Sequence, residues 1–458
     1  MNFFHNHQGS TGVAVLPTAW GKSLLCAWLA LTLEESGHKV LMVVPTLELL
    51  KQNKAKIEGY SDIEVGVYSG SLSKKENDKT LVIASINSLA DKHKDFKGFE
   101  YIIIDECHYK TPTRGGVFKK FVSKLKPKKI LGLTATPFVL GLKRGYNVLN
   151  MLQDIPYAIF NNIIHVTQVS SMLENKRWSK IKYIKTPYIK DGLVLNSTGN
   201  DFTEESVAEV NRLNNVNNLA IKLAIKHKED KTLIFVESIE VAEKMTNYLK
   251  SKLRGTRCET IHSGTPKAKR LKIVEDFKNS NGNFILINHK VFVMGFDDPT
   301  LKTIIKAFPT NSLMMYYQII GRLTRVHKDK PFGRYIDLCG NIDRFGFVEQ
   351  ITVEKTAKKD WSVYIGDRLI TGVPLGLGVE IKKEDIEKGR FIPFPKSTKR
   401  ITFGKHKGSL VTRLPSNYRQ FLIDSLQSNS YIDKEREELL KLLYDIRDSE
   451  VNMLVFNK

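Results

Sequence analysis

One stretch of the sequence decides the fold class: Val13-Ala14-Val15-Leu16-Pro17-Thr18-Ala19-Trp20-Gly21-Lys22-Ser23. Its apolar start predicts a buried strand over residues 13–16, and the pattern that follows predicts a helix from Lys22. At the N-terminus of such a helix, backbone N–H groups and the helix dipole favour an anion. The stretch therefore predicts a strand, a phosphate-binding loop and a helix in succession.

The same alternation of apolar runs and helical patterns continues along the chain in two blocks. The first block predicts strands at residues 40–44, 81–84, 101–104 and 130–133, with a helix from Leu47. The second begins near Asn215 and predicts strands at 233–236, 260–261, 284–287, 303–305 and 335–338, with helices at 241–253, 267–278 and 314–324. Such alternation favours parallel sheets covered by helices. We therefore expect two α/β lobes, at residues 1–150 and 215–345, joined by a basic segment at 151–214.

Composition bounds the class of partner. The 458 residues carry a formal net charge of +22, which favours nucleic acid or an acidic membrane. No apolar run approaches the roughly 18 residues that span a bilayer, and the N-terminus lacks the pattern of a signal peptide. Nucleic acid is therefore the better partner, and no membrane partner is expected. The 4 cysteines form no C-x-x-C pair, which indicates neither disulfides nor a zinc ribbon and favours the cytoplasm.

The predicted loop has the residue types that a triphosphate needs. Lys22 would neutralise β- and γ-phosphate oxygens, and the Ser23 hydroxyl would hold Mg²⁺. Thr18 and Gly21 would complete the loop around the phosphates. The pattern G-x-x-x-x-G-K-[ST] is incomplete, because Leu16 stands in place of its first Gly. ATP with Mg²⁺ is the predicted ligand.

A second chemical element, Asp105-Glu106-Cys107-His108, follows the expected strand 101–104. Adjacent carboxylates after a buried strand suit an ATPase, in which Asp105 would coordinate Mg²⁺ and Glu106 would orient and deprotonate the attacking water. One alternative is a helix N-cap with a solvated neighbour. Another is a zinc site with Cys107 and His108, which is disfavoured because adjacent residues of an extended segment point apart.

The Asp-Glu-Cys-His sequence resembles the Asp-Glu-x-His box of superfamily 2 helicases, and residues 4–338 resemble this family's motifs in order. Residues 133–137 resemble the Thr-Ala-Thr segment that couples hydrolysis to DNA movement, which assigns coupling to Thr134, Thr136 and His108. The resemblance implies an α/β fold with two tandem RecA-like lobes. Residues 346–458 would add a small α+β accessory region that binds DNA.

The resemblance also implies contacts with ligands. The implied nucleic-acid contacts are Thr46, Ser69, Gly70, Ser85, His262, Ser263 and Asn288, of which Ser85 and Asn288 stand where Thr is usual. Gly295 and Asp297 resemble the family's Gly-x-Asp element near the ribose. Gln8 would read adenine, and the alternative is a surface glutamine.

The second block contains Gln318-Ile319-Ile320-Gly321-Arg322-Leu323-Thr324-Arg325, which matches the family's Q-x-x-G-R-x-x-R pattern. On a helix, residues at i, i+4 and i+7 share a face, so Gln318, Arg322 and Arg325 are expected to reach one γ-phosphate. Arginine suits this role because its planar donors stabilise charge on the transferring phosphoryl group. The alternative is a basic helix face in solvent.

Two other segments combine basic and aromatic residues. In residues 176–185, Trp178 or Tyr183 could stack on a base, although we favour an amphipathic strand with a solvated basic face. The tail at 401–422 resembles a small module found after exonuclease X-type nuclease domains. Lys405 and Lys407 are its candidate DNA contacts, and the alternative is a basic loop beside a packing helix. No set of nuclease carboxylates accompanies it, so no cleavage is expected.

The expected function is a DNA-stimulated ATP hydrolase, a DNA helicase. The short N-terminus resembles phage recombination helicases, which implies branch migration of Holliday junctions and fork regression in recombination, replication or repair. The implied partners are branched or forked DNA and recombination or replication proteins. Two alternatives remain: a double-stranded DNA translocase without unwinding, and a protein that uses ATP only to gate DNA binding or annealing. The tail module disfavours an RNA helicase.

Overall fold

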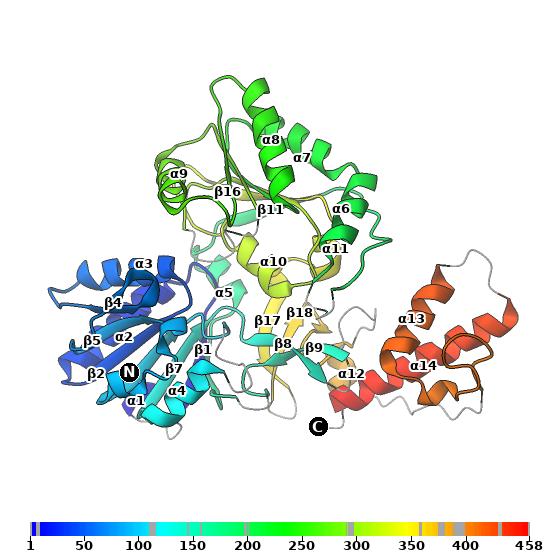
Figure 1. Ribbon diagram of the computed structural model, residues 1–458, viewed down its shortest axis with the longest axis horizontal. Helices are drawn as coiled ribbons and strands as arrows, with labels where there is room; N and C mark the ends of the chain where they lie inside the picture. The colour runs from blue at the N-terminus through cyan, green and yellow to red at the C-terminus, as the bar shows by residue number, and fades with distance from the viewer. Residues whose placement is uncertain are drawn as a thin grey trace. The chain divides into compact units, whose positions relative to one another are not determined.

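The computed structural model describes residues 2–5, 10–109, 116–143, 146–155, 158–196, 199, 201–289, 291, 297–356, 360–373, 381–387, 399–428 and 433–456. The chain divides into two compact units (Figure 1). The first unit comprises Met1–Pro137 and Pro156–Gln350 and contains the sheets of both α/β lobes. The expected bound of the first lobe at residue 150 is wrong, because residues 138–150 belong to the second unit. The second comprises Phe138–Ile155 and Ile351–Lys458.

The first lobe is an eight-stranded sheet in the order β10-β1-β7-β6-β2-β5-β3-β4, parallel throughout except for the β3–β4 pair. The strands are β1 Thr11–Val15, β2 Lys39–Val44, β3 Gly66–Ser69, β4 Lys74–Lys75, β5 Leu81–Ser85, β6 Phe99–Asp105, β7 Lys129–Thr134 and β10 Ile163–Val166. The helices are α1 Asn2–His5, α2 Lys22–Glu35, α3 Leu47–Glu58, α4 Val117–Leu125 and α5 Val169–Glu174, with short 3₁₀ turns at Gly70–Leu72, Ile86–Leu89 and His93–Phe96.

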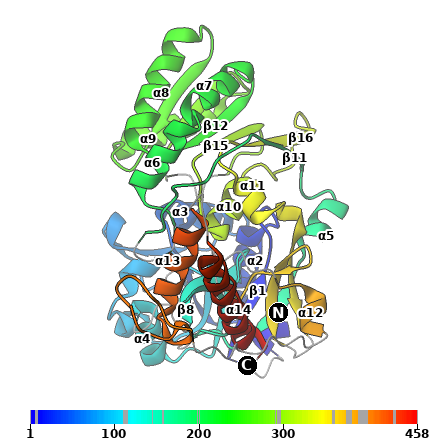
Figure 2. The ribbon, with the colours of Figure 1, turned by 90° about the vertical axis from the view of Figure 1, so that its right-hand side faces the viewer.

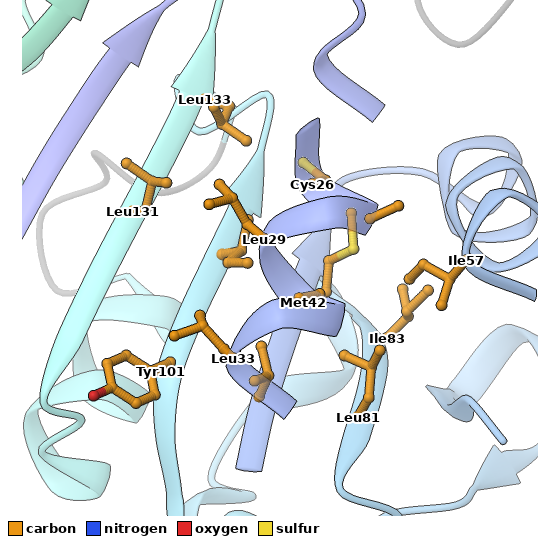
Figure 3. Close-up of a cluster of buried hydrophobic side chains, with 14 of the residues drawn as sticks. Cys26, Leu29, Leu33, Met42, Ile57, Leu81, Ile83, Tyr101, Leu131 and Leu133 are labelled. Atoms are coloured by element: carbon orange, nitrogen blue, oxygen red, sulfur yellow. The ribbon is translucent and has the colours of Figure 1, made fainter. Parts of the chain in front are cut away.

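The core of this lobe forms where α2 packs on the sheet. Its residues Cys26, Leu29 and Leu33 recur at helical spacing and are buried against strand residues such as Met42 and Leu131 (Figure 3). Burying a leucine side chain contributes about 1.5–3 kcal/mol relative to leaving it exposed. This packing holds the first turn of α2, which begins at Lys22, in place at the end of β1.

The second lobe is a fully parallel six-stranded sheet in the order β11-β16-β15-β12-β14-β13. Its strands are β11 Lys180–Lys185, β12 Lys231–Val236, β13 Arg257–Ile261, β14 Phe284–Asn288, β15 Thr303–Ala307 and β16 Phe332–Asp337. Its helices are α6 Glu204–Leu213, α7 Val216–Lys226, α8 Ile239–Lys252, α9 Lys267–Asn279, α10 Leu313–Ile320 and α11 Asn341–Phe345, and a 3₁₀ turn follows at Val348–Gln350. Helices α7 and α8 lie side by side against this sheet (Figures 1 and 2).

Every expected strand forms, with bounds that differ by a few residues, but two expectations need correction. Residues 151–214 are not simply a connecting segment, because they contribute β10 to the first sheet and β11 to the second. Exposure alternates along β11, so the interpretation as an amphipathic strand is confirmed. The helix expected at 314–324 ends at Ile320, because Gly321 opens a turn there.

The second unit holds an antiparallel hairpin, a small antiparallel sheet and a helical module. The hairpin is β8 Phe138–Lys143 with β9 Tyr146–Met151, and the sheet is β17 Ile351–Lys355, β18 Trp361–Ile365 and β19 Arg368–Leu369. The helices are α12 Lys383–Glu387, α13 Ser416–Gln427 and α14 Lys434–Phe456, with a 3₁₀ turn at Val411–Arg413. In the described part of the chain, no helix combines the length and the apolar character needed to cross a bilayer.

Candidate functional site

A cavity of about 250 Å³ in the first unit is lined by both lobes. The first lobe contributes Thr18, Ala19, Gly21, Lys22, Ser23, Leu49, Gln52, Lys56, Asp105, Glu106 and Ala135, and the second contributes Asp297, Gln318, Gly321, Arg322 and Arg325. Most of the residues predicted to hold ATP are therefore brought together. Gln8 and Gly295 lie outside the described residues.

The loop before α2 has the conformation that anion binding requires. Gly21 is the N-cap of α2 with φ of 103°, a left-handed value that favours glycine, and Ala19 is also left-handed. The Lys22 Nζ atom lies 3.4 Å from the Leu16 carbonyl oxygen and 3.5 Å from Glu106 Oε1. Leu16 itself is fully buried in the core, which explains an apolar residue where the motif usually has glycine.

Two carboxylates face Lys22 from the end of β6. Asp105 is buried and accepts hydrogen bonds from the Glu106 backbone N–H at 3.0 Å and from Asn53 Nδ2 at 3.4 Å. Burial, together with the charge of Glu106, raises the pKa of Asp105 to about 6. Burial would also raise the pKa of Glu106, but Lys22 and Arg322 outweigh it and hold that pKa below its usual value. Glu106 is therefore ionised at neutral pH and able to accept a proton.

The oxygen donors in the cavity suit Mg²⁺. Ser23 offers a hydroxyl and Asp105 a carboxylate, which are the hard ligands that Mg²⁺ takes alongside phosphate and water oxygens. The zinc alternative fails on geometry, because a Cβ on Gly132 would meet the Cys107 sulfur at 2.6 Å whereas the His108 ring bonds Thr134. The two side chains therefore point to different places. Within the described ranges, no group of three or more His, Cys, Asp and Glu side chains could hold a metal ion.

The three residues assigned to coupling form one buried cluster. His108 Nδ1 lies 2.8 Å from Thr134 Oγ1 and 3.3 Å from Thr136 Oγ1, and the Thr136 backbone N–H donates to Thr134 Oγ1 at 2.9 Å. Glu106 Oε2 lies 3.4 Å from the same imidazole nitrogen. The cluster therefore joins Glu106 to the segment after β7.

The second-lobe residues reach the cavity by a route that differs from the helical prediction. Gln318 lies on α10, but Arg322 and Arg325 follow its end, where the Arg322 and Leu323 backbone N–H groups donate three residues back. The prediction that the three residues share one helix face is therefore wrong. A turn after α10 brings the two guanidinium groups to the cavity instead. Arg325 Nε donates to Asp297 Oδ1 at 2.5 Å. Burial and the charge of Arg325 lower the pKa of Arg322 to about 10, so it stays charged.

Contacts with Thr18 that the sequence did not predict join the two lobes. The indole of Trp178 donates from Nε1 to the Thr18 carbonyl at 2.7 Å, and a Cβ on Gly321 would lie 2.7 Å from the Thr18 side chain. Trp178 is 3% exposed, and Tyr183 is held by a hydrogen bond from its hydroxyl to Glu349. Base stacking by either ring is therefore contradicted.

Helix α3 supplies a cavity wall that sequence reasoning missed. Leu49, Gln52 and Lys56 line the cavity, and the fully buried Asn53 donates to Asp105. The sequence feature that could have revealed this wall is the spacing of these positions. On a helix capped by the Thr46 side chain, residues three and four apart lie next to one another on the same side.

The candidate nucleic-acid contacts fall into two groups. Thr46 and Gly70 follow the strands β2 and β3, and Ser85 is the last residue of β5 and is 9% exposed. Ser88 Oγ accepts from the Gly70 backbone N–H and contacts Ser85 Oγ. Ser263 is exposed and His262 is partly buried, after β13. By contrast, the side chains of Ser69 and Asn288 are fully buried, and Asn288 donates to the Ile234 carbonyl. Direct contact through these two side chains is therefore wrong.

Comparisons with known proteins agree with the site. Residues 1–139 match the family described as type III restriction enzyme, res subunit, and residues 213–327 match the helicase conserved C-terminal domain. The chain is 26% identical to the ATP-dependent helicase candidate IRC3 of Saccharomyces cerevisiae, over 73% of this chain and 49% of that protein. It is 25% identical to the ATP-dependent DNA helicase uvsW of Enterobacteria phage T4, over 70% of this chain and 64% of that protein.

Solved structures show the same fold. The ATP-dependent type ISP restriction-modification enzyme LlaBIII bound to DNA matches with a TM-score of 0.56 and 16% identity, over 73% of this chain and 26% of that one. The two matched domains, in this order, and the helicase-named relatives support an assignment to superfamily 2 of the helicases. It spans 49% and 64% of the two relatives' lengths, so their complete activities do not transfer directly.

Proposed function

We propose that this chain is an ATP-dependent DNA translocase that remodels branched DNA. The observation that carries the proposal is the cavity in which Lys22, Asp105 and Glu106 of one lobe face Arg322 and Arg325 of the other. A triphosphate bound there would contact both lobes through the same phosphate. The state of the nucleotide would then control whether the lobes close.

Each residue has a distinct role in this proposal. Lys22 binds the phosphates, Glu106 orients the attacking water and accepts its proton, and Arg322 with Arg325 stabilises charge on the transferring phosphoryl group. Gln318 would add a further polar contact with the phosphates. Asp297 accepts a hydrogen bond from the Arg325 guanidinium and would lie near the ribose. Mg²⁺ held by Ser23 and Asp105 would neutralise charge on the phosphate oxygens.

The sheet order supports a position for the DNA. The carboxyl ends of parallel strands meet at one edge of a sheet, so the segments after β1, β6 and β7 lie beside those after β2, β5 and β3. ATP would occupy the first group, and one DNA strand would contact Thr46, Gly70 and Ser85 in the second group and His262 and Ser263 of the other lobe. His108, Thr134 and Thr136 would transmit closure between the two groups.

Two observations support DNA as the polymer on which a branched substrate would be built. The net charge of +22 suits a polyanion with several duplex arms, and the phage T4 relative is named a DNA helicase. Lys405 and Lys407 are exposed in the second unit, where they would contact a further part of the DNA. Holliday-junction branch migration and fork regression are the reactions that such contacts would support.

A mobile four-way junction tests the proposal. The chain should convert it to duplex products with ATP, and Lys22→Ala should abolish both that conversion and DNA-stimulated hydrolysis. Lys222→Ala is a control, since Lys222 is exposed on α7 and does not line the cavity. Normal turnover in the Lys22 variant would refute the site, and hydrolysis without strand exchange would refute only the branched substrate. Displacement of a protein roadblock without strand separation would indicate a double-stranded DNA translocase instead.

A further inference from the structure

The helical module of the second unit presents a group of aromatic rings that the motor does not use. We name it the aromatic surface and define it by the contacting rings of His406, Tyr418 and Phe421 together with Phe403, which precedes the Gly404 that lies against Tyr418. The His406 and Tyr418 rings lie 4.4 Å apart, and the Tyr418 and Phe421 rings lie 5.8 Å apart at an interplanar angle of 32°. Phe403 is 40% exposed and Phe421 is 59% exposed. Exposed aromatic rings grouped in this way usually mark a binding surface.

The loop that carries Phe403 and His406 is firmly built. The Gly408 backbone N–H donates to the Ile401 carbonyl at 2.7 Å, and the Ile401 N–H donates to the Ser409 carbonyl at 2.9 Å. Gly404 has φ of 71°, and a Cβ there would meet the Tyr418 hydroxyl at 2.6 Å. Glycine therefore allows the loop to lie directly against α13. The backbone of the loop is therefore held against Tyr418 before any ligand binds, which lowers the entropic cost of binding.

A hydrophobic core of the module supports this surface from below. Ile401 and Leu414 beside the loop pack with Leu422 and Ile423 of α13 and with residues of α14. The helices α13 and α14 lie side by side (Figure 2). Because this core already buries its own apolar side chains, Phe403 and Phe421 are not needed to hold the module together. Their exposure calls for another explanation.

The charges around the rings indicate the occupant. Residues 399–428 contain 6 Lys and Arg but 1 Asp. Lys399 pairs with Glu438 of α14 and Arg419 is buried, whereas Lys405 and Lys407 flank His406 with exposed side chains. Neither lysine forms an ion pair with another residue of the described ranges. Alternating aromatic and basic groups match a nucleic-acid strand whose bases stack while its phosphates contact lysine. Duplex DNA would not use the rings, because its bases are already stacked.

We propose that the aromatic surface binds unpaired bases of single-stranded DNA, with Phe421 and Phe403 as the stacking rings and Lys405 and Lys407 as the phosphate contacts. This inference deepens the proposed function and rests on it, since a branched substrate would supply unpaired bases. Lys405 and Lys407 alone would bind any DNA. The rings add preference for unpaired bases.

Binding of a fluorescent single-stranded oligonucleotide, measured by anisotropy without nucleotide, tests this assignment. The full chain with Phe403→Ala and Phe421→Ala should bind at least about 10-fold more weakly, because each stacked base contributes substantially to affinity. Tyr60→Ala is the matched control, since Tyr60 is 67% exposed and follows the far end of α3. Affinity for a blunt duplex should not change in either variant.

An abasic oligonucleotide separates stacking from charge. Removing the bases should weaken binding of the unchanged chain but should have little further effect on the Phe403 and Phe421 double variant. Lys405→Ala should instead lower the slope of log affinity against log salt by about 0.7, as expected for one phosphate contact on a single strand. Equal effects of base removal in both proteins would overturn the assignment, and so would tighter binding of an RNA of the same sequence.

The experiment remains informative if the motor proposal fails. It is repeated with Lys22→Ala, in which hydrolysis is expected to be lost and the aromatic surface is unchanged. Base-dependent binding in that variant supports the aromatic surface whether or not the chain moves on DNA. The Phe403 and Phe421 double variant separates the two proposals. If it still converts the junction and binds single strands with unchanged affinity, the role assigned to the aromatic surface is overturned and the motor proposal stands.

Discussion

Gly321→Ala should impair hydrolysis by forcing the lobes apart. Gly321 has φ of −56°, so its backbone accepts alanine without strain. The added Cβ would lie 2.7 Å from both Cγ2 and Oγ1 of Thr18. Carbon atoms prefer separations of about 3.5–4.0 Å, so the overlap is close to an ångström. Thr18 cannot easily retreat, because the Trp178 indole holds its carbonyl.

The size of the effect follows from this overlap. Overpacking of this kind costs about 1–3 kcal/mol, which lowers the population of the closed arrangement about 5- to 150-fold. DNA-stimulated hydrolysis at limiting ATP should fall within that range. The melting temperature should change little, since the clash lies between lobes and each lobe retains its own core.

A double-mutant cycle checks the cause. Thr18→Ala removes both atoms at 2.7 Å, so it should cost less in the Gly321→Ala background than in the unchanged chain. Additive effects of the two substitutions would show that this contact is not responsible. Unchanged hydrolysis in Gly321→Ala alone would refute the closed arrangement as the active one.

Three further substitutions probe the same cavity. Arg325→Ala should lower hydrolysis by about 10³-fold or more while fluorescent-nucleotide binding stays nearly unchanged; equal losses of binding and rate would contradict a transition-state role. Asn53→Ala removes a donor to Asp105 and should raise the Mg²⁺ concentration for half-maximal hydrolysis about 10-fold, which a Mg²⁺ titration measures; an unchanged titration would exclude a positioning role. Trp178→Phe keeps an aromatic ring but leaves the Thr18 carbonyl without its donor, which costs about 1–3 kcal/mol. The KM for ATP should therefore rise at least about fivefold; an unchanged KM in steady-state kinetics would show that this hydrogen bond does not support ATP binding.

The sequence by itself determined the elements and the chemistry of each motif. Continuous apolar runs and helical patterns depend on neighbouring residues, so they located most strands of both sheets and the start of α2 at Lys22, but not β3, β4 or β10. Adjacent carboxylates after a buried strand identified Asp105 and Glu106 for the same reason. These features are local, and local spacing is what a sequence displays.

The tertiary structure decided which residues meet. Nothing near Trp178 in the sequence indicates that its indole bonds Thr18, 160 residues away. Burial removed Asn288 from the candidate DNA contacts although its motif is recognisable, because only the packed sheet shows that its amide faces Ile234. The structure also shows that the chain leaves α10 after Ile320 and reaches Arg325 by a turn. The sequence does not display this, because the close approach of Gly321 to Thr18 depends on the packing of two lobes. Long-range packing selects among the alternatives that local patterns leave open.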